Sequence, residues 1–273
     1  MGLRSLAVAA LTAALLCACG SGAGAKPVQP GSKAAHGVEV VRYKVRSREV
    51  DRTLRQVAAR PPGGGKRPLL VFLHGRGKRG EESNANGAFF TALADLGDRA
   101  PAVVFPSGGE ASYFHRRRSG DWGRYVLDEV IPEAVRRLDA DPRRVAIGGI
   151  SMGGFGAFSV ARLRPRAFCA VGGHSAALWL RAGDTPPGAF DDAADFGRND
   201  LVGLARAHGR APWRGAELWL DGGTGDPFRS AGEAFAGALG IDMRHWKGGH
   251  SGDYWHAHYD DYLRFYARAL ARC

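Results

Sequence analysis

The amino-acid sequence predicts an α/β fold in which a mostly parallel central sheet has helices on both faces. Apolar runs at residues 68–73, 102–106 and 145–147 predict strands, and the run at 68–73 is typical of a central parallel strand that is buried on both faces. Residues 127–138 have the apolar spacing of an amphipathic helix with a kink at Pro132. Of the 273 residues, 45% are hydrophobic and 24% are charged. This composition suits one domain with a large core.

The other expected elements fit the same architecture. Alternating apolar residues predict two antiparallel strands within residues 38–59. Further strands are expected at 168–171, 218–221 and 243–246, and helices at 88–97, 157–163, 230–239 and 255–269. Residues 178–214 are rich in Pro, Gly and Asp with only a weak helical pattern. We interpret them as a small cap-like insertion that shapes an acyl pocket.

The first residues have the pattern of an export signal. Arg4 precedes an apolar run, residues 6–16, that is too short to cross a bilayer as a mature helix. Leu16-Cys17-Ala18-Cys19 resembles a bacterial lipobox, in which Cys19 would carry the lipid, whereas Ala23-Gly24-Ala25 fits cleavage for plain secretion after Ala25. The sequence leaves both sites open and favours the lipobox.

These patterns define the expected domain organisation and location. We expect a lipoprotein signal at 1–18, a flexible tether at 19–36 and a catalytic domain at 37–273. The lipid would anchor the protein to the cell membrane, facing outward, and secretion is the alternative. After either cut, Cys169 and Cys273 remain at what we expect to be the same edge of the sheet. They either form a disulfide or stay as two thiols.

The chain is basic, with a formal net charge of +11. This charge is compatible with contact to anionic lipid headgroups or cell-wall polymers, although a coding bias towards arginine would also produce it. No recognised nucleic-acid module is present, so we expect no nucleic-acid partner.

One short motif carries the chemistry. Gly149-Ile150-Ser151-Met152-Gly153 lies between a predicted strand and a predicted helix. Strand, tight turn and helix with a serine at the tip form the nucleophile elbow of α/β-hydrolases. Gly149 and Gly153 let the strand and the helix pass closely. Ser175 and Ser251 lack the second glycine, so Ser151 is the predicted nucleophile.

A second loop is expected to complete the oxyanion hole. His74-Gly75-Arg76-Gly77 follows the strand at 68–73. In a hydrolase such a loop supplies one backbone N–H, and the residue after the nucleophile supplies the other. We therefore expect Gly75 to permit the turn and the amides of Arg76 and Met152 to bind the oxyanion.

Basic residues lie in loops that should overhang this site. Arg116, Arg117 and Arg118, together with Lys78 and Arg79, are candidates for a basic rim that attracts an anionic part of the substrate. An ordinary solvated loop explains them equally well.

The acid and the base are expected after the serine, in that order. Asp226 lies in the loop after the strand at 218–221, where a carboxylate can reach a histidine, whereas Asp221 ends the strand and is expected to cap backbone groups. His250 lies in the loop after the last predicted strand. We therefore predict Asp226 as the acid and His250 as the base.

The remaining histidines do not indicate a metal site. His256 and His258 are two residues apart on a predicted helix and point to different sides. The sequence contains no H-E-x-x-H, P-loop or dinucleotide motif. We expect no metal and no cofactor.

Residues 67–270 resemble the esterase branch of the α/β-hydrolase superfamily, which includes esterase D type S-formylglutathione hydrolases, feruloyl, acetyl-xylan and enterochelin esterases, and mycobacterial mycolyltransferases. The marks are residues 125–132, 149–157, 223–228 and 248–250 with Tyr254-Trp255 behind them. The resemblance implies the same roles for Ser151, Asp226 and His250. Ser251-Gly252 departs from the larger pair usual in relatives, on the leaving-group side of the pocket.

The sequence thus predicts an exported, lipid-anchored serine esterase that forms an acyl-enzyme from a small-molecule or cell-envelope ester. The alternative is an acyltransferase of the mycolyltransferase type with the same triad. A non-catalytic, wall-binding lipoprotein is the less favoured third hypothesis.

Overall fold

The computed structural model describes residues 37–273. The predicted signal at 1–18, the lipid site Cys19, the tether at 19–36 and the alternative cut after Ala25 lie outside the described residues.

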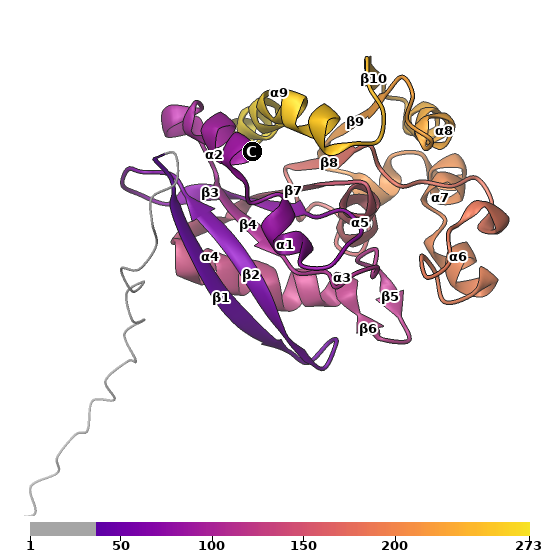
Figure 1. The fold of residues 1–273 in the computed structure, drawn as a ribbon, viewed down its shortest axis with the longest axis horizontal. Helices are drawn as coiled ribbons and strands as arrows, with labels where there is room; N and C mark the ends of the chain where they lie inside the picture. Colours follow the sequence, from indigo (N-terminus) through magenta and orange to yellow (C-terminus); the bar gives the residue numbers. More distant parts are fainter. Residues whose placement is uncertain (1–36) are drawn as a thin grey trace, which may run out of the picture. The chain divides into compact units, whose positions relative to one another are not determined.

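An eight-stranded sheet forms the centre of the described part of the chain, with strand order β1-β2-β4-β3-β7-β8-β9-β10 (Figure 1). The pairs β1–β2 and β2–β4 are antiparallel, and the other neighbours run parallel. The strands are β1 (Glu39–Ser47), β2 (Arg52–Arg60), β3 (Arg67–Leu73), β4 (Ala102–Pro106), β7 (Ala140–Ile150), β8 (Ala170–His174), β9 (Glu217–Gly223) and β10 (Met243–Trp246); β5 (Arg116–Arg117) and β6 (Gly120–Asp121) form a separate ribbon.

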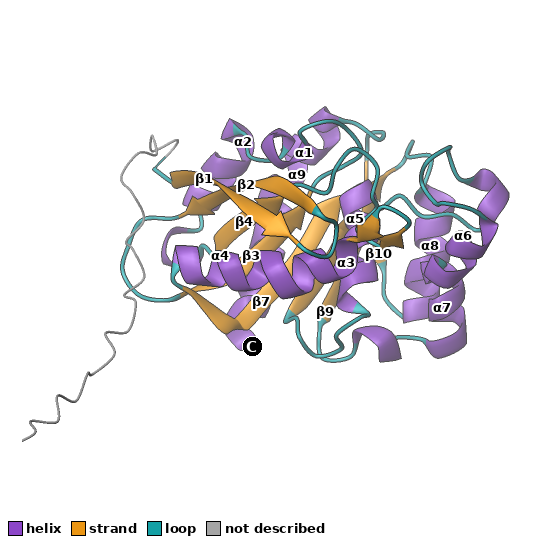
Figure 2. Ribbon diagram, turned by 90° about the horizontal axis from the view of Figure 1, so that it is seen from below, coloured by secondary structure: helices purple, strands orange, loops and turns teal. Residues whose placement is uncertain are grey.

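Helices cover both faces of this sheet, as Figure 2 shows. The α-helices are α1 (Gly80–Ser83), α2 (Gly87–Ala94), α3 (Trp122–Arg124), α4 (Ile131–Leu138), α5 (Met152–Ala161), α6 (Ala193–Asn199), α7 (Leu201–His208), α8 (Arg229–Leu239) and α9 (Gly252–Arg272). Short turns of other helix types are η1 (Gly97–Arg99), η2 (Tyr125–Val130), η3 (Ala182–Asp184) and η4 (Ala211–Trp213). Helices α2 and α9 contribute to one core layer, and η2, α4, α5 and α8 contribute to the other. The predicted α/β fold is confirmed.

Local sequence explains the difference between edge and central strands. In β1 the side chains alternate, with Tyr43 and Val45 buried and Arg42 and Lys44 exposed, because one face of this edge strand meets solvent. In β4 every residue is buried, as expected for an inner strand covered on both faces.

The segment predicted as one kinked helix contains two helix types. Residues Tyr125–Val130 are π-helical and continue without a break into α4, which begins at Ile131. Val130 and Ile131 both have right-handed helical backbone angles, and the Ile131 amide donates to the carbonyl of Val126, five residues earlier. Pro132 follows directly and has no N–H to donate, so the change from π-helix to α-helix falls where the proline interrupts the hydrogen-bond pattern.

The segment at 178–214 packs onto the domain through apolar side chains. Leu201 and Val202 of α7 and Trp213 of η4 are buried in the same core layer as α5. The indole N–H of Trp213 donates to the carbonyl of Phe158 in α5 at 2.8 Å. This contact fixes the end of the segment to the helix that follows the elbow.

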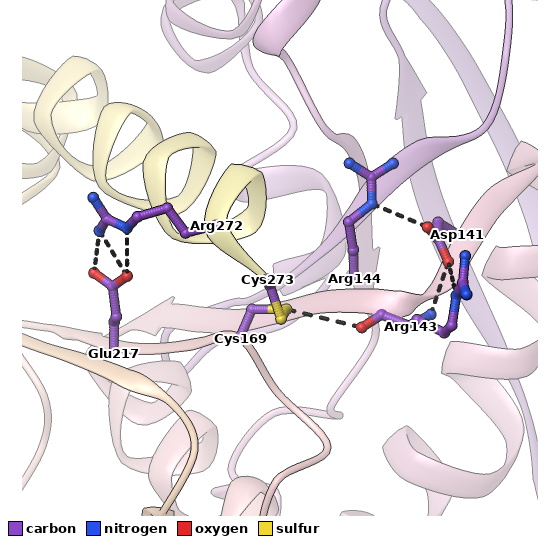
Figure 3. Close-up of a disulfide and its surroundings, with 7 residues drawn as sticks. All are labelled: Asp141, Arg143, Arg144, Cys169, Glu217, Arg272 and Cys273. Atoms are coloured by element: carbon purple, nitrogen blue, oxygen red, sulfur yellow. Dashed lines mark hydrogen bonds and ion pairs between the residues drawn. A yellow bond between two sulfur atoms is a disulfide. The ribbon is translucent and has the colours of Figure 1, made fainter.

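A disulfide joins Cys169, just before β8, to Cys273, just after α9 (Figure 3). The two Cα atoms are 5.7 Å apart, within the normal range for a disulfide. Beside it, Arg272 forms an ion pair with Glu217 at 2.6 Å. Of the two alternatives that the sequence leaves open, the structure has the disulfide. Among the helices of residues 37–273, none has the length and apolar character needed to cross a membrane.

Candidate active site

Ser151 lies at the turn between β7 and α5, with φ 55° and ψ −114°. A positive φ is uncommon for a residue other than glycine, and such backbone strain gathers at functional sites. A Cβ atom at Gly149 would come within 2.6 Å of backbone atoms of Gly153, and one at Gly153 within 2.2 Å of the carbonyl oxygen of Leu73. The turn can be this tight only with glycine at both positions.

The structure brings Ser151, His250 and Asp226 together. The Nε2 atom of His250 is 2.8 Å from Ser151 Oγ, and its Nδ1 atom is 3.0 Å from Asp226 Oδ2. Because the carboxylate accepts at Nδ1, the imidazole carries its proton there and leaves Nε2 free to accept one from the serine. The ring of His250 lies edge-on to Phe228 and Trp255, with centroids 5.0 and 5.1 Å away.

Asp226 is held as a carboxylate although it is buried. Burial alone would raise the pKa of Asp226, but the His250 ring N–H and the Phe228 amide, which donates at 2.9 Å, outweigh it and hold this pKa below its usual value. The loops that carry Asp226 and His250 are also joined, because the amide of Gly225 donates to the carbonyl of Gly248 at 2.8 Å.

The loop after β3 lies against Ser151. A Cβ atom at Gly75 would be 3.6 Å from Ser151 Cβ. His74, the residue before Gly75, is buried. Its Nε2 atom accepts a hydrogen bond from the Gly108 amide at 2.8 Å. The ring proton therefore lies on Nδ1, which donates to the Gly75 carbonyl at 2.6 Å.

This contact sets the direction of one amide. The Gly75 carbonyl and the Arg76 N–H belong to the same planar trans peptide and point in opposite directions. The hydrogen bond from His74 therefore turns the Arg76 N–H away from His74. This loop was expected at the site, but the part played by the His74 side chain was not; its only signal was a histidine directly after a buried strand.

The other predicted oxyanion donor, Met152, is the first residue of α5. Its side chain is fully buried. Its amide belongs to the first turn of a helix, where backbone N–H groups have no intrahelical acceptor.

Asp221 is not the cap of backbone groups that we expected. Its carboxylate is fully buried and accepts hydrogen bonds from four side chains, which are His174, Trp219, Tyr254 and Tyr262. The preference for Asp226 over Asp221 as the partner of His250 agrees with the observed contacts. The cluster around Asp221 was missed because its donors come from three separate elements.

Two residues of the predicted basic rim pair with acidic side chains. Arg117 forms an ion pair with Asp191 at 2.9 Å, and Arg118 pairs with Asp192 at 2.8 Å. Both ion pairs link the 178–214 segment to the domain. The side chain of Arg117 is only 10% exposed, whereas that of Arg118 is 76% exposed, so a role of Arg118 in a basic rim stays a prediction. Arg116 remains exposed.

A cleft of about 240 Å³ lies near the loop that follows β3. Its lining includes residues 108–112, Trp122 and Gly188. The Gly77 amide donates to the Glu110 carbonyl at 2.9 Å, which joins the loop after β3 to the wall of the cleft. Gly188 is the residue of the 178–214 segment that lines this cleft. That the segment shapes an acyl pocket stays a prediction.

Within residues 37–273, no group of three or more His, Cys, Asp or Glu side chains is arranged to hold a metal ion. His258 stacks on Trp246 with ring centroids 4.1 Å apart, and His256 is exposed. Neither contacts the proposed catalytic residues.

Comparisons with known proteins give one family match and several similar structures. A family model described as "putative esterase" matches residues 50–265. A ferulic acid esterase has a similar structure, with a TM-score of 0.75 and 22% identity over 85% of this chain and 98% of that one. An S-formylglutathione hydrolase from Agrobacterium tumefaciens gives a TM-score of 0.74 and 20% identity over 88% of this chain and 99% of that one. No curated protein matched the sequence.

At this level of identity the solved structures establish the fold, and the family match extends over most of the domain. The chain therefore belongs to the Esterase family of the α/β-hydrolase superfamily and is a serine carboxylic-ester hydrolase.

Proposed function

We propose that this esterase works through a triad of Ser151, His250 and Asp226 and an acyl-enzyme intermediate. The observation that carries the proposal is the unbroken line of hydrogen bonds, 2.8 Å from serine to imidazole and 3.0 Å from imidazole to carboxylate. It begins at a serine whose backbone is held in a strained turn. These are the geometric requirements of nucleophilic catalysis by serine.

In the first half-reaction, Ser151 Oγ attacks the ester carbonyl carbon while His250 Nε2 takes the serine proton. Asp226 stabilises the imidazolium that forms. The carbonyl oxygen becomes an oxyanion, and the amides of Arg76 and Met152 donate to it; a lost donor would cost about 3 kcal/mol of transition-state stabilisation. His250 then gives its proton to the departing alcohol, and the acyl group remains on Ser151.

In the second half-reaction, water attacks the acyl-enzyme. His250 removes a proton from this water, the tetrahedral intermediate collapses, and Ser151 leaves with a proton returned by His250. The products are the free acid and the regenerated enzyme. The alcohol of a sugar or of glycerol in place of water would make the same triad an acyltransferase.

We further propose that the enzyme is exported and carries a lipid on Cys19. The disulfide between Cys169 and Cys273 supports export, because disulfides persist in oxidising compartments. The proposed substrates are esters that an outward-facing, membrane-anchored enzyme can reach: small soluble esters or esters of the cell envelope. Mass spectrometry of the mature N-terminus distinguishes a lipidated Cys19 from a free N-terminus after Ala25.

The test of the catalytic proposal is hydrolysis of p-nitrophenyl esters of increasing acyl length by the wild-type protein and by Ser151→Ala. We expect turnover by the wild type and only background from the variant. A fluorophosphonate probe should label the wild-type protein at Ser151. Equal rates for the two proteins would refute the role of Ser151, and an acylated product formed with added glycerol would favour the transferase.

A further inference from the structure

A second His–Asp pair lies buried beside the candidate site, and the proposed chemistry does not use it. Asp221 Oδ2 accepts from His174 Nδ1 at 2.6 Å and from the indole of Trp219 at 2.7 Å. Asp221 Oδ1 accepts from the hydroxyls of Tyr262 at 3.0 Å and Tyr254 at 3.2 Å. A buried carboxylate is costly unless its oxygens are satisfied, and here each oxygen has two donors.

One side of this carboxylate leads to the nucleophile. Ile150, His174 and Asp221 are in register across the adjacent parallel strands β7, β8 and β9. The Ser151 amide donates to the His174 carbonyl at 2.9 Å. The backbone of Ser151 is thus hydrogen-bonded to His174, and the side chain of His174 is hydrogen-bonded to Asp221.

The other side leads to the base. Tyr254 lies in the first turn of α9, four residues after His250. Its ring packs on the loop that carries the histidine, since a Cβ atom at Gly248 would come within 2.7 Å of it. The hydroxyl of Tyr254 therefore ties the base loop to β9.

We propose that Asp221 is a positioning residue that sets the distance between Ser151 and His250, by holding His174 on one side and Tyr254 on the other. The proposal rests on the catalytic roles assigned to Ser151 and His250. Asp221 touches neither substrate nor the reacting atoms; it acts through its two neighbours. A displacement of about 1 Å in a catalytic group can lower the rate of catalysis by about 10²-fold, so the loss of a positioning residue has a measurable effect.

The surrounding residues support this function. Burial and the nearby Asp221 carboxylate raise the pKa of Tyr254 and of Tyr262, so both phenols keep the protons that they donate. The outer nitrogen of His174, Nε2, lies 2.8 Å from the hydroxyl of Tyr266. A Cβ atom at Gly148 or Gly172 would come within 1.7 or 2.0 Å of that hydroxyl, so both positions leave room for it.

Two matched variants separate positioning from stability. Tyr254→Phe and Tyr262→Phe each delete one hydroxyl that donates to the same atom, Asp221 Oδ1. Both keep the aromatic ring, but only Tyr254 contacts the base loop. We expect kcat of Tyr254→Phe to fall about tenfold and KM to stay within about twofold, whereas Tyr262→Phe keeps kcat within about twofold.

Thermal unfolding of both variants and the downfield proton NMR signal of His250 Nδ1–H complete the test. The signal should shift or broaden in Tyr254→Phe and stay unchanged in Tyr262→Phe. Equal effects of the two variants on kcat and on the signal would overturn the proposal. Asp221→Asn, if folded, should lower kcat by about 10²-fold; unchanged kcat there would also overturn it.

The NMR measurement needs no substrate. If the wild type and Ser151→Ala hydrolyse esters equally, the proposed function fails, while the His250 signal still decides whether Tyr254 positions the imidazole.

Discussion

The Nε2 atom of His74 lies 2.8 Å from the amide nitrogen of Gly108, and this contact fixes which nitrogen of the ring carries the proton. The proton sits on Nδ1 and is directed at the Gly75 carbonyl. Burial lowers the pKa of His74, so the ring stays neutral at neutral pH. One buried imidazole thus holds two loops beside Ser151 together and orients the peptide between Gly75 and Arg76.

His74→Phe should therefore impair the oxyanion hole while it preserves most of the packing. We expect kcat to fall by about 10- to 100-fold with little change in KM, because the donor acts mainly in the transition state. Steady-state kinetics and the affinity for a trifluoromethyl ketone inhibitor, which mimics the oxyanion, check this. A normal kcat in a variant with native circular dichroism would contradict it.

Arg76→Gln should be nearly harmless to the chemistry. The proposed donor is the backbone N–H, which every residue except proline retains. The guanidinium, whose Nη2 donates to the Pro187 carbonyl at 3.2 Å, is exposed. We expect kcat for p-nitrophenyl acetate within about threefold of the wild type. A loss as large as that of His74→Phe would show that the side chain itself takes part.

Asp226 gives the enzyme an acid-sensitive component of stability. Its pKa in the folded protein lies below the value of about 3.9 expected in the unfolded chain. The stabilisation is complete above that value and is lost as the pH falls through the folded-state pKa. Urea unfolding between about pH 5 and pH 2 should show a smaller loss of unfolding free energy for Asp226→Asn than for the wild type.

The same substitution tests catalysis. Asp226→Asn should lower kcat by about 10³- to 10⁴-fold, because an amide does not hold the imidazole in the required tautomer. Asp191→Asn serves as a control. It removes a carboxylate of the 178–214 segment that pairs with Arg117, and this variant should retain far more activity. Equal losses in the two variants would argue against Asp226 as the catalytic acid.

Cys273→Ser should destabilise the protein without changing its chemistry. The disulfide closes a loop with a sequence separation of 104 residues, and loops of this length give about 4.7 kcal/mol in the chain-entropy model. We expect a lower urea midpoint and a kcat near that of the wild type at 25 °C. Reduction of the wild type should reproduce the shift; identical midpoints before and after reduction would count against a stabilising disulfide.

Much of the architecture follows from local sequence. Continuous apolar runs mark β3 and β4, because strands covered on both faces need no polar side chains. The glycines around Ser151 mark the elbow, since a tight strand-to-helix turn excludes Cβ atoms. Chain order in this fold then points to Asp226 and His250, which the structure places within hydrogen-bond distance; their catalytic roles stay predictions.

Contacts between distant segments were not predictable in this way. Asp221 looks like an ordinary strand-end residue until β8 and α9 bring His174 and Tyr254 to it. Arg117 and Arg118 look like free surface charges until the 178–214 segment folds back and supplies Asp191 and Asp192. The residue pattern within one segment does not predict such pairings, because they depend on how distant helices and strands pack together.

The bond between Cys169 and Cys273 makes residues 169–273 a covalent ring that contains Asp226 and His250 but excludes Ser151. A protease that cuts this ring once, for example at the exposed Leu180, leaves the C-terminal piece attached through sulfur to the piece that bears the serine. A nicked molecule would thus keep Ser151 and His250 in one covalently linked assembly until a reductant breaks the disulfide.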